Sequence, residues 1–311
     1  MRRADKKLLT ERFEEFNALC AGIVLLAISF LLVPADVRGA SMGIGASVRY
    51  SWWDPYWSQV SDTRILPRIT VKSDFSGGPV VSIGIDDTWG LFASYTYGKY
   101  EGDVTSLLLN PLFYYIEQPV TTKRVARRHE FNLFVSGRVA SHVKIFGGIV
   151  YSGYDMVTES SVLFLAYSNR IFHHFAGPAA GVDFTIPLVS TLYLLPGVSA
   201  VFQFSRFVDD KDTIFSEAIN TRFGGTDTTL LYAGLNCTLS LAYYIRKIDL
   251  TVALGGRFHY LWIEDIDAGD FVADGRHDMF GSIHLTLMYT FDFLKSSRSN
   301  AAGPVTLPKV L

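Results

Sequence analysis

Cysteine is nearly absent from this chain of 311 residues, which contains Cys20 and Cys237 and no others. Cys20 lies in an N-terminal apolar run that we expect to be removed, so Cys237 remains alone and a disulfide framework is excluded. The sequence also lacks a His/Cys metal cluster, a glycine-rich phosphate loop and a convincing nucleophile triad. These absences argue against an enzyme, and no cofactor is expected.

A strong charge of one sign and long apolar runs are lacking as well. The formal net charge is -2, which predicts no nucleic-acid partner. Hydrophobic residues make up 49% of the chain, yet no segment beyond the N-terminal region has the roughly eighteen consecutive apolar residues of a membrane helix. Any membrane insertion of the mature chain must therefore come from strands, because only helices and closed barrels satisfy their backbone in lipid.

The N-terminal region has the pattern of an export signal. An uninterrupted apolar run, Ala18 to Val33, follows a basic stretch and is followed by Pro34 and small residues. The run is short for a helical span and is typical of a secretory signal peptide, which we place at residues 1–40. An uncleaved anchor is the alternative.

The most informative pattern in the mature chain is a repeated alternation of apolar and polar residues. It is clearest between Ile248 and Trp262, where Asp249, Thr251, Arg257 and His259 alternate with apolar side chains. Successive side chains of a strand point to opposite faces, so this strand has one greasy and one polar face. Its length and its aromatic end favour a membrane-spanning barrel with lipid outside and a wet lumen.

We expect about ten such strands, with eight or twelve as alternatives. They lie at residues 43–53, 79–86, 91–101, 129–139, 142–154, 176–186, 191–207, 228–244, 247–263 and 278–294. The predicted fold is therefore all-β, a transmembrane antiparallel up-and-down barrel at residues 41–294, with a polar C-terminal tail at residues 295–311. Pro196 inside the seventh strand predicts a local bulge or bend.

The connections alternate strictly between short and long. Four connections are tight turns, and the other five are long, at residues 54–78, 102–128, 155–175, 208–227 and 264–277. This parity predicts periplasmic turns, extracellular loops and two periplasmic termini. Aromatic residues gather at both ends of the strands, as expected of two interfacial girdles.

The final strand, Gly281 to Phe293, is similar to the closing strand that assembly machinery reads in small outer-membrane barrels of diderm bacteria. The mature chain resembles that group, and within it the OmpW/opacity-type barrels, while its strand count is also similar to that of the omptins. The resemblance implies a place in the outer membrane, with lipid and the barrel assembly machinery as partners. It implies passage of small solutes, surface adhesion or, for the omptins, proteolysis.

The omptin resemblance implies an aspartate pair facing an Asp-His pair at the top of the barrel. Asp86 and Asp87 lie at the wrong end, in a predicted periplasmic turn. Asp209 and Asp210 lie at the right height but no histidine follows them, although His259 could reach the rim. Proteolysis is therefore the least favoured of the three functions.

Charged residues on the predicted inner face are the candidate lumen-lining site. They are Arg49, Glu130, Arg138, Asp183, Arg206, Asp249, Arg257, His259, His284 and Asp292. Buried charges persist when paired, so the set forms either a plug of ion pairs or a charged constriction that selects a solute. A barrel of about ten strands leaves little more space than its side chains fill.

Aromatic and basic residues beside the long loops are candidates for surface binding of host molecules. They are Trp53, Tyr56, Trp57, Tyr114, Tyr115, Arg127 and Arg128. Extended hairpins packed on one another are favoured over binding as the use of these segments. Acidic residues at 264–274 could bind calcium, but their spacing lacks a complete calcium-loop pattern, and a solvated loop is favoured. The sequence favours a passive channel for small solutes, with a plugged surface-interaction barrel as the rival.

Overall fold

The computed structural model describes residues 41–55, 71–86, 88–109, 117–162, 165–209, 229–265 and 276–292. Within these ranges the chain forms eleven strands and no helix. The strands are β1 (Ser41–Asp54), β2 (Asp74–Gly84), β3 (Trp89–Leu109), β4 (Glu117–Ala140), β5 (Val143–Val162), β6 (Leu165–Phe184), β7 (Ile186–Val189), β8 (Leu192–Asp209), β9 (Thr229–Ile245), β10 (Leu250–Asp265) and β11 (His277–Asp292). The predicted signal peptide and the predicted polar tail from residue 295 lie outside the described residues.

No helix in the described part of the chain has the length and apolarity that crossing a membrane requires.

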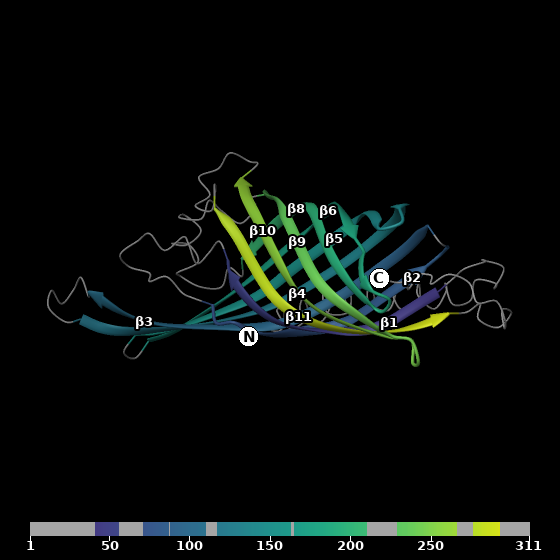
Figure 1. Ribbon diagram of the computed structural model, residues 1–311. Helices are drawn as coiled ribbons and strands as arrows, with labels where there is room; N and C mark the ends of the chain where they lie inside the picture. Colours follow the sequence, from purple (N-terminus) through teal and green to yellow (C-terminus); the bar gives the residue numbers. More distant parts are fainter. Residues whose placement is uncertain are drawn as a thin grey trace, which may run out of the picture. The chain divides into compact units, whose positions relative to one another are not determined.

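The strands form one closed antiparallel sheet. Each strand pairs with its sequence neighbours except that β6 and β7 do not pair with each other; β1 pairs with β11, and β6 pairs with β8. The short strand β7 continues the line of β6 after Thr185 and pairs with the N-terminal end of β8. Strands β6 and β7 therefore count as one strand of the wall, and the barrel is ten-stranded. The prediction of a ten-stranded up-and-down barrel is confirmed. Figure 1 shows the strands running obliquely beside one another, as closure of a barrel requires.

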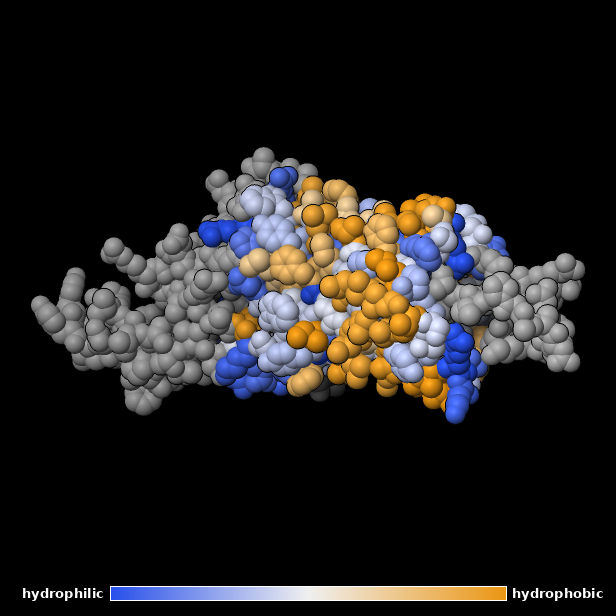
Figure 2. Space-filling model, viewed as in Figure 1, coloured by the Kyte–Doolittle hydropathy of each residue, from blue (hydrophilic) through white to orange (hydrophobic). Residues whose placement is uncertain are grey.

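Large apolar side chains cover the outside of the barrel. Exposed apolar residues occur on every strand, for example Val48 on β1, Ile149 on β5, Leu239 on β9 and Leu285 on β11. Figure 2 shows them gathered in an apolar zone with hydrophilic residues on either side. An apolar outer surface with a polar inner face is the arrangement of a barrel whose solvent is lipid.

Aromatic residues border this apolar zone. Toward the long-loop end, Tyr151 bonds His174 at 2.8 Å and Tyr95 bonds His129 at 2.8 Å, each across a strand pair. Toward the short-turn end, the rings of Tyr289 and Phe291 are in edge contact, with centroids 4.6 Å apart. These positions fit the expected girdles, because such rings have one apolar and one hydrogen-bonding side.

Two of the long connections predicted from the sequence are wrong. Strands β3 and β4 have 21 and 24 residues, and β5 and β6 have 20 each, so they occupy most of the predicted loops at 102–128 and 155–175. About ten residues suffice to cross a membrane in a tilted strand. The outer face turns from apolar to charged at Lys99 and Arg127, which are exposed, so alternation of apolar and polar residues ends there although pairing continues. The β3–β4 hairpin extends beyond the ends of its neighbours (Figure 1).

Two local expectations also differ. Pro196 causes no register shift against β9, because the Pro196–Leu239 pair continues the ladder. On its other edge, which faces β6 and β7, the ladder of β8 is interrupted. Two residue pairs are missing there between Asp183–Gly197 and Ile186–Leu194, because Pro196 has no N–H to donate. Asp249 lies just before β10, in a turn with φ of 49°, rather than inside a strand.

Candidate functional site

A buried ion pair crosses the barrel from wall to wall. Glu130 on β4 accepts a hydrogen bond from Nη1 of Arg257 on β10, and these two strands are separated by five ladders in either direction around the wall. Nε of Arg257 also donates to Oδ1 of Asn236 at 2.7 Å. Glu130 is 3% exposed. The pair therefore occupies the middle of the bore.

A second arginine joins this pair without adding a second carboxylate. Nη1 of Arg49 lies 3.7 Å from Oε1 of Glu130, and the Arg49 side chain is 11% exposed. Asn132 holds Glu130 in place by donating to its Oε1 at 3.2 Å and to Ser94 at 3.1 Å. Among the described residues, the Arg49–Glu130–Arg257 cluster thus sets two guanidinium groups against one carboxylate.

Toward the long-loop end, a packed layer of large side chains fills the bore. Trp53 on β1 meets Tyr154 on β5 with ring centroids 5.3 Å apart, a contact across the barrel. The guanidinium of Arg128 lies 5.1 Å from the Trp53 ring centroid and 4.5 Å from that of Phe280. Asp278 completes the layer by accepting from Nε1 of Trp53 at 2.9 Å and lying 3.9 Å from Arg128.

A histidine network extends this layer to the other side of the barrel. His173 is fully buried, and its two ring nitrogens bond Tyr154 at 2.6 Å and Ser205 at 2.7 Å. Tyr232 bonds the same ring at 3.4 Å and stacks on Phe175 with centroids 5.1 Å apart. We call the Trp53–Arg128–Phe280 stack and this network together the closing layer. Its members are at most 3% exposed, so they pack against one another at this level of the bore.

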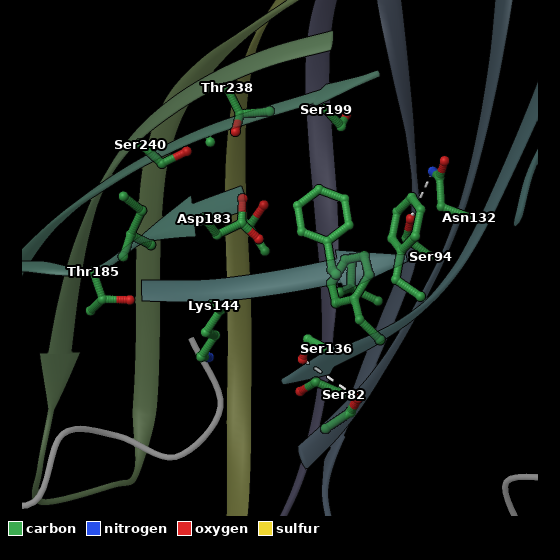
Figure 3. A pocket seen from close by; sticks show the side chains of 18 of the residues that line it. Ser82, Ser94, Asn132, Ser136, Lys144, Asp183, Thr185, Ser199, Thr238 and Ser240 are labelled. Carbon is green, nitrogen blue, oxygen red and sulfur yellow. Dashed lines mark hydrogen bonds between the residues drawn. The ribbon is translucent and has the colours of Figure 1, made fainter. Parts of the chain in front are cut away.

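On the other side of the charge cluster, the bore opens into a cavity of about 370 Å³. Figure 3 shows Asp183, Thr238 and Ser240 on one side of it and Ser94 and Asn132 on the other. Three phenylalanines on adjacent strands, Phe92, Phe134 and Phe146, form an apolar patch, with centroid distances of 6.5 Å and 5.1 Å between successive rings. The cavity thus has an aromatic wall, a hydroxyl-rich wall and a cationic inner end.

The cavity faces the short-turn end of the barrel. Arg138, Lys144 and Asp183 are successive ladder partners on β4, β5 and β6 and line its outer part. Asp86 in the β2–β3 turn also lines it, and its Oδ1 accepts from the backbone N–H groups of Trp89 and Thr88, each at 2.6 Å. These two hydrogen bonds lower the pKa of Asp86 below its usual value because they favour the ionised carboxylate, and the bond from Trp89 contributes more than that from Thr88.

The structure brings most predicted lumen residues onto the inner face. Seven of them either line the cavity or belong to the charge cluster: Arg49, Glu130, Arg138, Asp183, Arg257, His259 and His284. Asp249 does not join them, because in its turn it accepts a hydrogen bond from Tyr244 at 2.6 Å. Arg206 and Asp292 pair in the backbone ladders with Thr229 and Ser41, but their side chains lie outside the described residues.

Two predicted surface-binding residues are buried inside the barrel. Trp53 and Arg128 are each 3% exposed and belong to the closing layer, so their prediction as surface residues is wrong. The reason is the pleat, since Trp53 continues the inward series of Ser51 and Arg128 that of Glu130. Arg127, one residue before Arg128, is exposed as expected, and its Nη1 lies 3.4 Å from Oδ2 of Asp155. The other candidates, Tyr56, Trp57, Tyr114 and Tyr115, lie outside the described residues.

The omptin-type constellation does not form around His259. This residue is 2% exposed and pairs with Phe280 and Asn236, inside the barrel rather than at its rim. Asp86 lies at the opposite end, as the sequence indicated. Asp87, Asp210 and most of the acidic segment from residue 264 lie outside the described residues, as does the side chain of Asp209.

The sequence reasoning missed residues that matter most for closure. Asp278, Tyr154 and His173 are all on the inner face, yet the first was placed at a strand end and the others near or within a predicted loop. Asp278 and Tyr154 are terminal residues of predicted strands, and continuing the alternation three residues before the strand at 176–186 would have included His173. Asn132 and Asn236, the amides that orient the charge cluster by bonding Glu130 and Arg257, were not among the predicted site residues.

Comparison with known proteins supplies no family. No protein-family model matches the sequence, and no curated protein matches it. Among solved structures, the chain is similar to the outer-membrane protease OmpT of Escherichia coli, with 11% identity, a TM-score of 0.48, and coverage of 82% of this chain and 98% of that one. It is also similar to the attachment invasion locus protein Ail of Yersinia pestis, with 7% identity, a TM-score of 0.31, and coverage of 82% and 100%. A third is the Pseudomonas putida toluene transporter TodX, with 8% identity, a TM-score of 0.28, and coverage of 82% and 90%.

These likenesses are too distant to indicate a function. The closed ten-position wall, the apolar outer surface and the polar interior are those of a small outer-membrane β-barrel protein.

Proposed function

We propose that this barrel is a non-conducting outer-membrane scaffold whose function lies on the hairpins that extend beyond the membrane. The closing layer carries the proposal. A solute crossing the lumen would have to separate Trp53 from Tyr154 and Arg128 from Asp278, and all four are almost fully buried. The expectation of a passive channel is therefore the weaker of the two functions that the sequence left open.

The extended hairpins support the proposal independently. Strands β3 to β6 have 20 to 24 residues, about twice the number needed to cross the membrane. Their continued pairing makes a rigid sheet rather than a set of loops, since the β3–β4 ladder runs without interruption from Trp89–Gly137 to Leu109–Glu117. Ordered backbone hydrogen bonds far from the lipid are useful when the sheet presents residues to a partner.

The outer face of this sheet carries charges of both signs. Lys123 and Arg127 are exposed on β4, and Lys99 and Glu101 form an ion pair on β3. Such a mixed surface fits a macromolecular partner that is read by complementary charge. In this proposal the hairpins are extracellular, and both ends of the barrel wall, Ser41 and Asp292, face the periplasm.

The orientation is tested by labelling intact cells. Lys123→Cys, in a Cys237→Ser background, is expressed in a diderm host and treated with a membrane-impermeant maleimide. Extracellular hairpins give labelling of Cys at position 123 on intact cells, whereas Ser141→Cys in the opposite β4–β5 turn is labelled only after the outer membrane is permeabilised. The reverse pattern would overturn the orientation.

The surface role is tested on the same cells. Adhesion to heparin-coated and to laminin-coated surfaces is compared between the wild type and a variant in which residues 103–122 are replaced by a two-residue turn. We expect the wild type to adhere above the level of the empty host on at least one surface, and the shortened variant to return to that level while still inserting in the membrane. Equal adhesion of the two barrels and the empty host on both surfaces contradicts the proposed role.

A further inference from the structure

The proposed surface function assigns no function to the cavity on the short-turn side of the charge cluster. Its volume of about 370 Å³ lies within the range of about 300–1,000 Å³ typical of small-molecule sites. It is closed at its inner end by the Arg49–Glu130–Arg257 cluster. The space is therefore a blind pocket rather than one half of a channel.

The inner end of the pocket is short of negative charge. Two guanidinium groups share the single carboxylate of Glu130, and Arg257 has its best hydrogen bonds already made, to Glu130 and Asn236. Arg49 is less well satisfied, since its Nη1 is 3.7 Å from Glu130 and has no hydrogen-bond partner among the described residues. A buried charge without a close partner is costly, and an anion entering the pocket would supply one.

A second buried polar group points to the same ligand chemistry. Nε2 of His259 is buried and has no hydrogen-bond partner in the described part of the chain, although His259 lines the pocket. Buried side-chain nitrogens are normally hydrogen-bonded. A carboxylate at the inner end would offer acceptors to both Arg49 and the neighbouring imidazole when the latter carries its proton on Nε2.

The walls define the rest of the ligand. Phe92, Phe134 and Phe146 lie on β3, β4 and β5, opposite the hydroxyl groups of Ser240 and Thr286 on β9 and β11. Stacked and edge-on aromatic rings favour a flat or short apolar group beside them. At the outer part of the pocket Asp86 and Asp183 offset Arg138 and Lys144, so the uncompensated positive charge lies at the inner end.

We propose that this pocket binds a small amphipathic carboxylate, taken up from the short-turn side, with its carboxylate at Arg49 and its ring or short alkyl group against Phe92 and Phe134. This goes beyond the surface role and does not depend on it.

The test uses the barrel purified from membranes of an expression host in dodecyl maltoside, with 4-fluorophenylacetate as the probe and fluorine NMR as the readout. We expect saturable binding of this probe, and binding at least about tenfold weaker for neutral 4-fluorophenylacetamide, which loses the charge-assisted hydrogen bond. Acetate, which lacks the ring, should not displace the probe at equal concentration. Protein-free micelles give the background from partition into detergent.

Three variants locate the site. Arg49→Gln should weaken probe binding by about tenfold or more and stay folded, because Glu130 keeps Arg257 as its partner. Phe92→Ala should weaken the probe without making acetate a better ligand. The charge-matched control Arg127→Gln, on the outer face beyond the membrane, should bind like the wild type. Folding of each is checked by its heat-dependent mobility on a gel.

Three results would overturn the proposal. They are absence of saturable binding to the folded wild type, equal binding of the charged and neutral probes, and unchanged affinity in the folded Arg49→Gln variant. Full displacement by acetate would show a simple anion site and would reject the amphipathic ligand.

Discussion

Nε1 of Trp53 donates a hydrogen bond to Oδ1 of Asp278, 2.9 Å away, and so ties the first strand of the barrel to the last. Both side chains are almost fully buried. The β1–β11 ladder closes the barrel wall, and Trp53 pairs with Phe280 in that ladder. The sequence separation of 225 residues makes this contact a late and demanding one to form. The β1–β11 closure of the sheet and the closing layer therefore share residues.

Replacing Trp53 by Phe removes this donor but keeps most of the ring. Asp278 then retains Arg128 at 3.9 Å and loses its best hydrogen bond, so the free energy of unfolding should fall by about 1–3 kcal/mol. Urea unfolding in lipid vesicles, followed by tryptophan emission and gel mobility, measures it. Trp52→Phe on the outer face is the matched control and should cost less. Equal losses in the two variants would show that the buried hydrogen bond contributes nothing.

The cross-bore pair should behave as a coupled unit. Arg257→Ala leaves Glu130 with the amide of Asn132 and the more distant Arg49, and the loss of one partner from a buried ion pair costs about 3–5 kcal/mol. In a double-mutant cycle with Glu130→Ala, the double variant should lose clearly less than the two single losses combined. The exposed Arg127–Asp155 pair, 3.4 Å long, is the control and should couple by about 1 kcal/mol or less. Additive losses at Arg257 and Glu130 would contradict the pairing.

An outward glycine beneath a girdle tryptophan should tolerate no side chain. A Cβ on Gly281 would overlap the indole of Trp52, whereas a Cβ on Gly256 would meet only a backbone oxygen at 3.6 Å. Gly281→Ala should therefore cost about 1–3 kcal/mol of unfolding free energy and shift the emission of Trp52. Gly256→Ala should cost less and leave the emission unchanged. The reverse order would mean that Trp52 does not rest on Gly281.

The β2–β3 turn should give a pH-dependent contribution to stability. The pKa of Asp86 is lowered in the fold by the Trp89 and Thr88 amides, so its carboxylate stabilises the turn above the unfolded pKa of about 4. That contribution is lost as the pH falls through the lowered folded value. Asp86→Ala should thus be less stable than the wild type at pH 7, and the difference should shrink in acid. A constant difference from pH 7 down to pH 2 would exclude this carboxylate as the cause.

The sequence predicted the membrane-spanning strands, because contact with lipid on one face requires apolar and polar residues to alternate. All ten wall positions were found, because residues such as Leu239 and Leu285 must face lipid wherever the strand crosses the membrane. Extended hairpins were expected, but their bounds were not, because beyond the membrane the outer face of β4 carries Lys123 and Arg127 while its buried inner face carries Arg128, so alternation no longer marks the strand. Period-two patterns report burial on one face and not strand pairing itself.

The site was predicted residue by residue but not as an assembly. The pleat placed Glu130, Arg257 and Arg49 on the inner face, yet which residues meet across the bore depends on strand register and stagger, which a single sequence does not fix. The same limit explains Trp53 and Arg128, whose inward position follows from parity once the strands are known to continue.

The most direct measurement is the single-channel current of the wild-type barrel, purified from membranes and inserted in a planar lipid bilayer. A closed lumen is expected to give no discrete conductance steps at moderate voltage. A variant with Trp53→Ala, Arg128→Ala and Phe280→Ala together should conduct, which also shows that insertion occurs. Steady steps from the folded wild type, unchanged in this triple variant, would contradict a lumen closed by the Trp53–Arg128–Phe280 stack.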